Sequence, residues 1–213
     1  MPEAVNPRRY RSPRRAAQAA HTRESVIEAA RRLFSAMGYS STTVGAVAKE
    51  AGVSVDTVYT AVGRKPDLAR AVIDAVLGGE DARQRDYVQA IRAQRSAEDK
   101  LAAYAAATAH LVPRIAPLQE ALRRAGDTDA TCAVAWKGLV DRRAKNMREF
   151  AADLRATGQL RPDLADAEVA DLIWSMNAAE YWLLLEQRGW SPERYQRLLR
   201  DVWARTLLIT PTT

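Results

Sequence analysis

The sequence predicts an all-α protein, with an N-terminal three-helix helix-turn-helix domain followed by a larger helical domain. Apolar residues recur at three- and four-residue spacing along most of the chain. The alternating valine and threonine runs of strands and the Asn-Gly turns of hairpins are missing from the sequence. Two short helical patterns meet at Gly52, and a tight glycine turn between two helices makes them cross at a steep angle.

The chain begins with a segment unsuited to a core. Residues 1–18 carry three prolines, five arginines and few apolar side chains, which predicts a disordered basic arm. Two interpretations stay open for its arginines: they follow phosphates or enter a minor groove, or they only keep a tail in solution. They are Arg8, Arg9, Arg11, Arg14 and Arg15.

The first helix is expected from Thr22 to Met37, with an apolar stripe on one face and Gly38 at its end. The helix-turn-helix follows. Val44, Val47, Ala48 and Ala51 share one face of a helix that Thr43 can cap and Gly52 can end.

Ser54 can cap the second helix of this pair, which runs through Tyr59. Only Val58 looks core-facing, so its other side chains are left for contact with a partner. An ordinary pair of core helices is the alternative. A fourth helix is expected at 66–77, and its start contains Arg64, Lys65 and Pro66.

The run from Thr22 to about Val76 resembles the TetR family of transcriptional regulators. The matching residues are R-x-x-V-I-x-A-A-x-x-L-F-x-x-x-G-Y at 23–39, T-T-V at 42–44, A-x-x-A-G-V-S at 48–54 and T-V-Y at 57–59, with Lys65 and Leu68. They span roughly a quarter of the chain. The resemblance implies a DNA-binding homodimer whose body encloses a pocket for a small-molecule effector.

Charge is distributed unevenly along the chain. Residues 1–78 hold twelve Lys/Arg and seven Asp/Glu, whereas residues 79–213 hold twenty and nineteen. An electropositive head on a nearly neutral body suits phosphate binding. The single cysteine, Cys132, allows no internal disulfide and fits a reducing cytoplasm. No apolar run is long enough to span a membrane and no signal peptide is recognised, so a cytoplasmic protein is expected.

Three parts are expected: a basic arm at 1–18, a DNA-binding domain at 19–78 and a ligand-binding and dimerisation domain at 79–213. The boundary is placed at Gly78–Gly79, the clearest turn signal in the chain. Body helices are expected at about 80–94, 97–112, 117–125, 128–157, 166–188 and 192–208. Pro113 and Pro117 are expected to break the chain after the second of these, and Asp127 or Thr128 can cap the fourth.

The DNA interface is expected on the second helix of the helix-turn-helix and its flanks. Val55, Asp56, Thr57 and Thr60 would read bases, while Thr43, Tyr59 and Lys65 would hold phosphates. Gly45 stands where the family often has a polar or basic contact, and Asp56 stands where it often has glycine or proline. The full candidate set is Thr43, Gly45, Ser54, Val55, Asp56, Thr57, Tyr59, Thr60, Arg64 and Lys65.

The last two expected helices are apolar on more than one face, so they need burial on more than one face. They are either central in the body or paired with a second copy, and the resemblance implies a four-helix dimer interface. The expected interface residues are Leu183, Tyr195, Leu199, Val202 and Trp203.

Pocket candidates are polar or aromatic groups on otherwise apolar helix faces. Trp174, Asn177 and Tyr181 are spaced to share one face. Ordinary core packing is the alternative for each of them. The candidates are Tyr104, Thr108, His110, Trp136, Met147, Trp174, Asn177 and Tyr181.

An enzyme is not expected, because the sequence has two histidines, one cysteine, no glycine-rich phosphate loop and no metal-ligand spacing. Neither a cofactor nor a metal is expected. The favoured function is a repressor that leaves a palindromic operator when a small apolar ligand binds its body. A nonspecific architectural DNA-binding protein is the alternative, and a helical enzyme is the least favoured.

Overall fold

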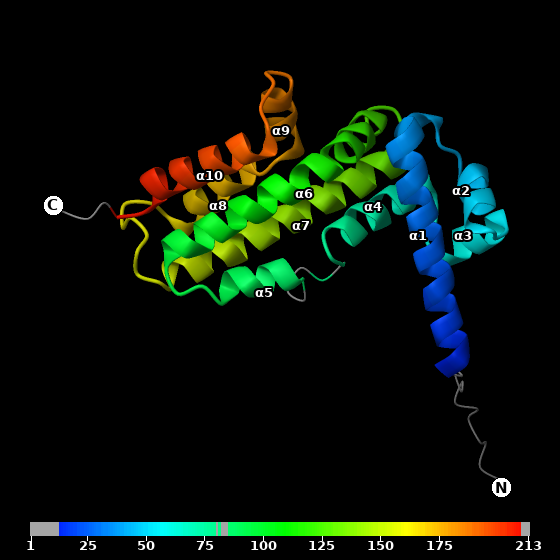
Figure 1. Ribbon diagram of the computed structural model, residues 1–213, viewed down its shortest axis with the longest axis horizontal. Helices are drawn as coiled ribbons and strands as arrows, with labels where there is room; N and C mark the ends of the chain where they lie inside the picture. The colour runs from blue at the N-terminus through cyan, green and yellow to red at the C-terminus, as the bar shows by residue number, and fades with distance from the viewer. Residues whose placement is uncertain (1–12, 80, 82–84, 210–213) are drawn as a thin grey trace, which may run out of the picture.

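The computed structural model describes residues 13–79, 81 and 85–209 of the chain, and this part is helical throughout (Figure 1). Within it, β pairing is limited to one isolated bridge between Leu160 and Leu208. The all-α prediction is confirmed. The helices are α1 (Pro13–Ser41), α2 (Val44–Ala51), α3 (Val55–Ala61), α4 (Lys65–Val76), α5 (Asp86–Arg92), α6 (Ala97–Ala125), α7 (Ala130–Arg155), α8 (Asp166–Met176), α9 (Ala179–Glu186) and α10 (Pro192–Leu207).

The capping residues expected around the turn at Gly52 are all confirmed. The Thr43 hydroxyl accepts from the Ala46 amide at 3.1 Å, and the Ser54 hydroxyl accepts from the Thr57 amide at 3.1 Å. Gly52 has φ 68°, a left-handed conformation that glycine adopts without steric cost, and its N–H bonds carbonyls of α2. The turn is therefore closed by backbone and capping groups together.

The first helix begins earlier than the sequence indicated. Residues 13–18, assigned to the disordered arm, form the opening turns of α1. Alanines at 16, 17, 19 and 20 explain this, because alanine has the strongest intrinsic helix propensity. Arg8, Arg9 and Arg11 lie outside the described residues. Gly38 interrupts the helical geometry with φ 79° and ψ 166°, at the predicted end of the helix, and one further helical turn follows.

The first half of the body, up to the start of α7, differs from the sequence prediction at three places. Of the helix expected at 80–94, the described residues form α5, from Asp86 to Arg92. The helices expected at 97–112 and 117–125 are one helix, α6, which continues through Pro113 and Pro117. Each interior proline costs a hydrogen bond, but α6 packs against α1, α4, α5, α7, α9 and α10, and this burial outweighs local propensity. The cap of α7 is Asp129 rather than Asp127 or Thr128.

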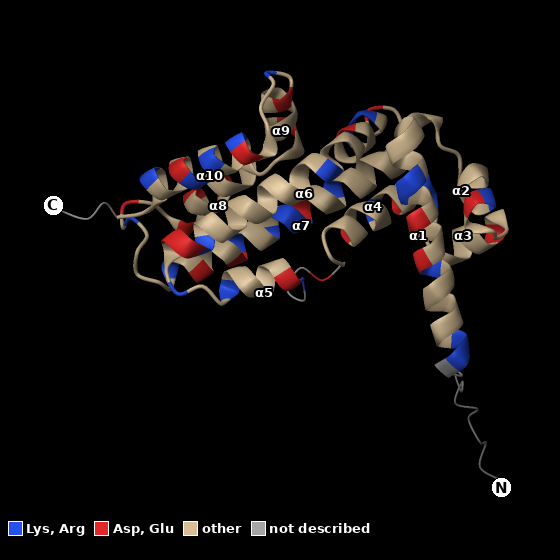
Figure 2. Cartoon of the chain, in the orientation of Figure 1, with Lys and Arg blue, Asp and Glu red and all other residues tan. Residues whose placement is uncertain are grey.

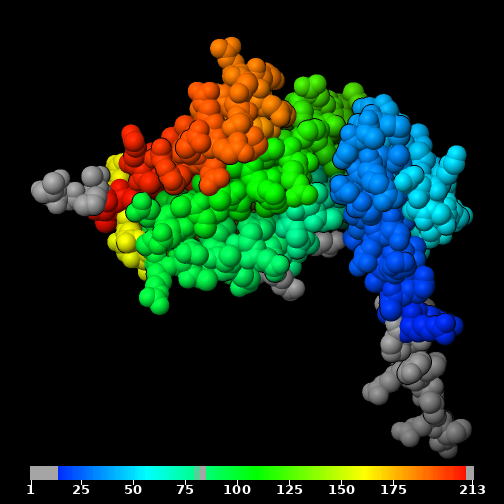
Figure 3. Space-filling view, in the orientation of Figure 1, coloured from blue at the N-terminus to red at the C-terminus, as the bar shows by residue number. Residues whose placement is uncertain are grey.

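The helix expected at 166–188 is two helices, because the chain leaves the helical conformation at Asn177 and Ala178. Ala178 is extended, with ψ 148°. The side chain of Asn177 is buried and hydrogen-bonded to other helices, and asparagine readily exchanges helical hydrogen bonds for side-chain ones. As a result α9 projects from the body (Figures 1 and 3).

Two hydrophobic clusters organise the chain. One joins α6, α7, α8, α9 and α10 and includes Trp203, Tyr195 and Leu199. The other holds α1 to α4 together and also contains Leu122 of α6 and Leu139 of α7. The head, α1 to α4, is thus packed onto the ends of two body helices rather than attached only through the glycines at 78 and 79.

The last helix faces its own chain. Tyr195, Leu199 and Trp203 are fully buried, and the Tyr195 hydroxyl donates to the Met176 carbonyl at 2.6 Å. These three were predicted to face a second copy, and that prediction is wrong, because one stripe of α10 packs on α6 while charged residues cover its outer side (Figure 2). Leu183 and Val202 are half-buried. No helix in the described ranges is long and apolar enough to cross a membrane.

Candidate functional site

The outer face of α3 lies at the end of the molecule farthest from the body (Figure 1). Val58 is fully buried and anchors this helix in the core of the head. Val55 and Tyr59 remain 40% and 49% exposed, and Asp56 and Thr60 are exposed beside them. The structure therefore places the predicted base-reading side chains on one accessible surface, with Thr57 half-buried at its edge.

Internal hydrogen bonds orient this surface. The hydroxyls of Ser54 and Thr57 lie 2.8 Å apart, and the Thr60 hydroxyl donates to the Asp56 carbonyl at 2.8 Å. The Asp56 carboxylate lies in the first turn of α3, where it faces the positive end of the helix dipole. The short polar side chains of α3 are held close to the helix, so that a duplex can approach it closely.

The candidate residues that flank α3 differ in how far they are exposed. Thr43 and Gly45 are exposed, and a Cβ added at Gly45 would lie 3.8 Å from the Thr43 hydroxyl, an ordinary contact. Arg64 is exposed, whereas Lys65 turns back toward the head. Its ammonium donates to the Ser40 carbonyl at 3.1 Å and lies 4.5 Å from the centre of the Tyr39 ring. Partial burial lowers the pKa of Lys65. One of its three N–H donors is thus used within the head.

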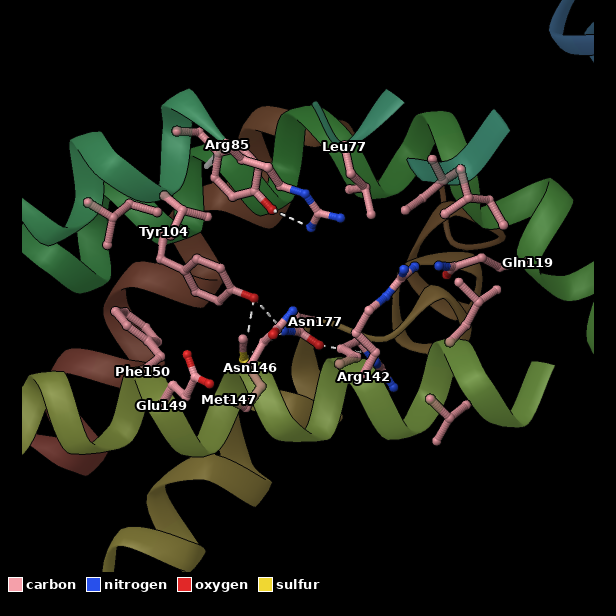
Figure 4. Close-up of a pocket in the computed structure, with 18 of the residues that line it drawn as sticks. Leu77, Arg85, Tyr104, Gln119, Arg142, Asn146, Met147, Glu149, Phe150 and Asn177 are labelled. Atoms are coloured by element: carbon pink, nitrogen blue, oxygen red, sulfur yellow. Dashed lines mark hydrogen bonds between the residues drawn. The ribbon is translucent and has the colours of Figure 1, made fainter. Parts of the chain in front are cut away.

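A cavity of about 140 Å³ lies in the body among α4, α5, α6, α7 and the end of α8 (Figure 4). Four of the eight pocket residues predicted from sequence line it, namely Tyr104, Trp136, Met147 and Asn177. They come from two helices, α6 and α7, and from the end of α8, so tertiary packing brings them together.

The other four predicted pocket residues do not line this cavity, and the structure shows what each contacts instead. Thr108 is buried within the body. His110 is exposed beside Arg114, and Tyr181 packs against Tyr195. The break at Asn177 removes the face on which Trp174, Asn177 and Tyr181 were predicted to stand together.

The centre of the cavity wall is a connected set of polar groups. The Asn177 amide nitrogen donates to the Tyr104 hydroxyl at 2.6 Å and approaches the Met147 sulfur at 3.2 Å. The Tyr104 hydroxyl donates to the same sulfur at 3.3 Å (Figure 4). Burial raises the pKa of Tyr104, so its phenol stays neutral and donates. Arg143 donates to the Asn177 carbonyl oxygen at 2.9 Å and stacks on Trp174.

Two of the arginines that line the cavity, Arg85 and Arg142, contact a buried carboxylate that does not itself line it. Asp74 of α4 is bonded by Arg142 of α7 and lies 3.8 Å from Arg85, which also donates to the Gly79 carbonyl. Asp74 and Arg85 are each 4% exposed. This group ties α4, the last helix of the head, to the body helix α7 beside the cavity.

Sequence reasoning missed these arginines, although one signal was available. Leu139, Arg143, Met147 and Ala151 follow one another at four-residue spacing along α7, so Arg143 stands within an apolar stripe. A charged residue in such a stripe marks a polar feature inside the body. Arg85 and Arg142 gave no comparable signal, since their partner Asp74 lies on a different helix.

Residues 26–72 match the family model described as bacterial regulatory proteins, tetR family. No match was found among curated proteins.

Solved structures share the fold. A transcriptional regulator from Saccharomonospora viridis in complex with choline has a TM-score of 0.68 and 16% identity, covering 90% of this chain and 100% of its own. A TetR-family regulator from Rhodococcus sp. has a TM-score of 0.64 and 18% identity, with coverages of 86% and 96%. A complex of SmeT with triclosan has a TM-score of 0.66 and 18% identity, with coverages of 90% and 93%.

At these identities the likeness shows the fold, and the match at residues 26–72 adds the family. The exposed second helix of a capped helix-turn-helix, built from those same residues, agrees with both. Residues 26–72 thus match the DNA-binding region of the TetR family of transcriptional regulators, and the chain as a whole shares the fold of solved TetR-family regulators.

Proposed function

We propose that this protein is a repressor that binds a palindromic operator as a homodimer and leaves it when a small molecule occupies the body cavity. It acts by binding rather than by catalysis. The observation that carries the proposal is the accessible outer face of α3, on a helix-turn-helix whose core continues into the ends of α6 and α7. In this proposal residues 19–78 are the DNA-binding domain and residues 79–213 are the ligand-binding and dimerisation domain.

The second helix of a helix-turn-helix enters the major groove. There Val55 would contact a thymine methyl group and Asp56 would accept from a cytosine amine, with Thr57 and Thr60 contacting neighbouring base edges. The phosphate contacts would come from Thr43, Tyr59 and Arg64, joined by the free donors of Lys65. Since α3 has only seven residues, one head offers a small contact area, and two heads about 34 Å apart would match successive major grooves.

The proposed dimer contact lies on α9 and the adjoining edge of α10. Leu184 is 64% exposed on the projecting α9, although a leucine is usually buried. Leu183, which precedes it, and Val202 of α10 are half-buried against the body cluster. A second copy covering these side chains would remove their apolar surface from water.

The cavity is placed so that its occupant can act on the head. Ile73 and Leu77, at the end of α4, line the cavity together with residues of α7. The Asp74–Arg142 contact joins the same two helices. A ligand that fits better when α4 has shifted would favour a head spacing that no longer matches the operator. The choline and triclosan complexes support this proposal, since proteins with this fold hold small molecules.

Selection from a random duplex pool at physiological salt tests the proposal. We expect a palindrome with half-sites about one DNA turn apart. The protein should bind this palindrome with an affinity about 10³-fold or more above its affinity for bulk DNA. Unselected sequence, with affinity that falls steeply with salt, would instead indicate an architectural DNA-binding protein.

The selected operator then tests the surface of α3. Tyr59→Phe removes one hydroxyl from an exposed side chain, so it should weaken operator binding severalfold without changing the thermal unfolding temperature. Phe substitution at Tyr104, inside the body, is the matched control and should leave the affinity of the unliganded protein for the operator unchanged. Equal operator affinity of Tyr59→Phe and the parent protein would contradict the proposed phosphate contact.

A further inference from the structure

The polar group at the centre of the cavity wall, formed by Tyr104, Met147, Asn177 and Arg143, has more hydrogen-bond donors than good acceptors. The Tyr104 hydroxyl and the Asn177 amide nitrogen both direct a hydrogen at the Met147 sulfur, which is only a weak acceptor. The Asn177 carbonyl oxygen is already used by Arg143. Met147, Asn177 and Tyr104 all line the cavity, so these donors stand at its surface with little to accept from them.

Arg143 adds a charge to this surplus. Its guanidinium has five N–H groups, and its partners in the described structure are the neutral amide of Asn177 and the ring of Trp174, 4.5 Å from the guanidinium carbon. No described carboxylate lies within 4.0 Å of it, and only a weaker attraction comes from Glu180. Loss of hydration lowers the pKa of Arg143. A partly buried cation without a contacting anion is under-compensated.

Each of the other charged side chains that line the described cavity contacts a partner of opposite charge. Arg92 pairs with Glu149 at 3.5 Å, and Asp153 pairs with Lys100 at 2.9 Å. Arg85 and Arg142 share Asp74. The charge balance of the described wall is therefore positive, and Arg143 is the cation in it that no described carboxylate contacts, so a ligand could neutralise it.

The rest of the cavity wall limits the polarity and the size of the ligand. It is formed by aliphatic and aromatic side chains, namely Ile73, Leu77, Val88, Ile91, Ile115, Trp136, Leu139, Val140 and Phe150. The cavity of about 140 Å³ is close to the roughly 150 Å³ that accommodates benzene in an engineered apolar cavity. Its occupant is thus compact, with an apolar part about the size of one ring.

We propose that the cavity binds a small organic carboxylate with a compact apolar body, whose oxygens accept from Arg143, Asn177 and Tyr104. A planar carboxylate matches the fork of a guanidinium and can accept two parallel hydrogen bonds. It also supplies the acceptors that the Met147 sulfur replaces poorly. A cationic ligand of the choline type would bring a second positive charge beside Arg143, and its single neutral hydroxyl would accept less well than a carboxylate. This proposal names the ligand class of the proposed repressor. It depends on the repressor function only for the release of DNA, not for binding in the cavity.

Three probe sets test the charge of the ligand by titration calorimetry and thermal shift on the full chain without DNA. Benzoate, phenylacetate and hexanoate are each compared with the neutral amide and with the amine of the same carbon skeleton. We expect at least one carboxylate to bind about tenfold or more tightly than its amide, and each amine to bind more weakly still. The proposal is overturned if no carboxylate binds more tightly than its amide, or if an amine binds best.

Variants of α7 test the assignment to Arg143. Arg143→Met keeps the apolar stem and should remove the preference for the carboxylate over the amide. Arg148→Met, on the exposed side of the same helix, is the matched control and should keep the preference. Arg143→Lys retains charge without the planar fork, and an intermediate preference is expected even if Arg143→Met fails to fold. Equal carboxylate preference in the parent and both Arg143 variants would overturn the assignment.

The two proposals fail separately. If a carboxylate binds but the selected operator complex persists, the ligand class stands and release by ligand falls. If the operator is recognised but no carboxylate binds, the regulator stands and the ligand class falls.

Discussion

Gly138 and Gly158 differ in the one property that decides whether glycine helps a helix. Gly138 lies on the exposed side of α7 with helical dihedral angles, and Gly158 follows the end of α7 with φ 71°. A Cβ added at either position would meet no atom within 4 Å. Only backbone conformation therefore separates the effects of placing alanine at these two sites.

We expect Gly138→Ala to raise the free energy of unfolding by about 0.5–1 kcal/mol, because alanine restricts the unfolded chain and suits a helix interior. Gly158→Ala should lower it by about 1–2 kcal/mol, since alanine is strained at positive φ. Urea unfolding of both variants gives the comparison. A stabilising Gly158→Ala, or a destabilising Gly138→Ala, would contradict this explanation.

Arg143 shows a second residue-scale effect, because its role depends on what packs around it. On the sequence it interrupts an apolar stripe. In the structure the Trp174 ring stacks on its guanidinium, and the Asn177 side-chain oxygen accepts a hydrogen bond from it. Lys65 is the converse case, since a lysine that looked free for phosphate is drawn toward the Ser40 carbonyl.

At the scale of elements, α3 depends on its ends more than on its length. An isolated helix of seven residues would not form in water. It is held by the buried side chain of Val58 and by the Ser54 hydroxyl, which accepts from the Thr57 amide. The order of the contact surface of the head therefore depends on the Ser54 cap and the Val58 anchor.

Ser54→Ala removes the cap of α3 and should lower the free energy of unfolding by about 1 kcal/mol, measured by urea denaturation. Ser54→Asp restores an acceptor at the same position and should recover most of this loss. The explanation fails if alanine and aspartate give the same stability.

The break between α8 and α9 determines which surface the body offers for assembly. Because Asn177 and Ala178 leave the helix, α9 turns out of the body and exposes Leu184. A continuous helix over the same residues would have kept one direction along the body. The break thus supplies both the amide of the cavity wall and the projecting surface proposed for the dimer.

At the scale of the whole molecule, head and body are joined by shared packing and by charge. Leu122 and Leu139 of the body belong to the cluster that forms the head's core. Asp74 adds a buried ionic contact from α4 to Arg142 and Arg85. A displacement of α7 by a ligand therefore reaches α4 through direct contacts, without an intervening flexible linker.

The proposed dimer makes a prediction at the same scale. Leu184→Glu places a charge on the exposed tip of α9, so it should convert the homodimer to a monomer while leaving the unfolding temperature of the monomer unchanged. Light scattering after size exclusion measures the mass. Val134→Glu is the matched control, because Val134 is 74% exposed on α7, and it should remain dimeric.

A monomeric parent protein would remove the proposed dimer altogether. Dissociation by Val134→Glu but not by Leu184→Glu would move the interface to α7. Leu199→Glu is unsuitable for this test, since Leu199 is fully buried in its own chain and a charge there would unfold the body.

The sequence by itself determined the features that depend on neighbouring residues. The helical class, the turn at Gly52, the caps at Thr43 and Ser54 and the outward face of α3 follow from periodicity and short-range hydrogen bonds, which are written in consecutive positions. The family resemblance rests on the same local motifs, and so does the anchor at Val58.

Only the tertiary structure decided the features that depend on residues far apart in the chain. Packing on six other helices keeps α6 continuous through Pro113 and Pro117, and burial of Asn177 ends α8. The same packing turns Trp203 inward and gathers Tyr104, Arg143 and Asn177 around one cavity. Periodicity identifies which face of a helix is apolar, but the partner that covers that face is set by the three-dimensional arrangement of the whole chain.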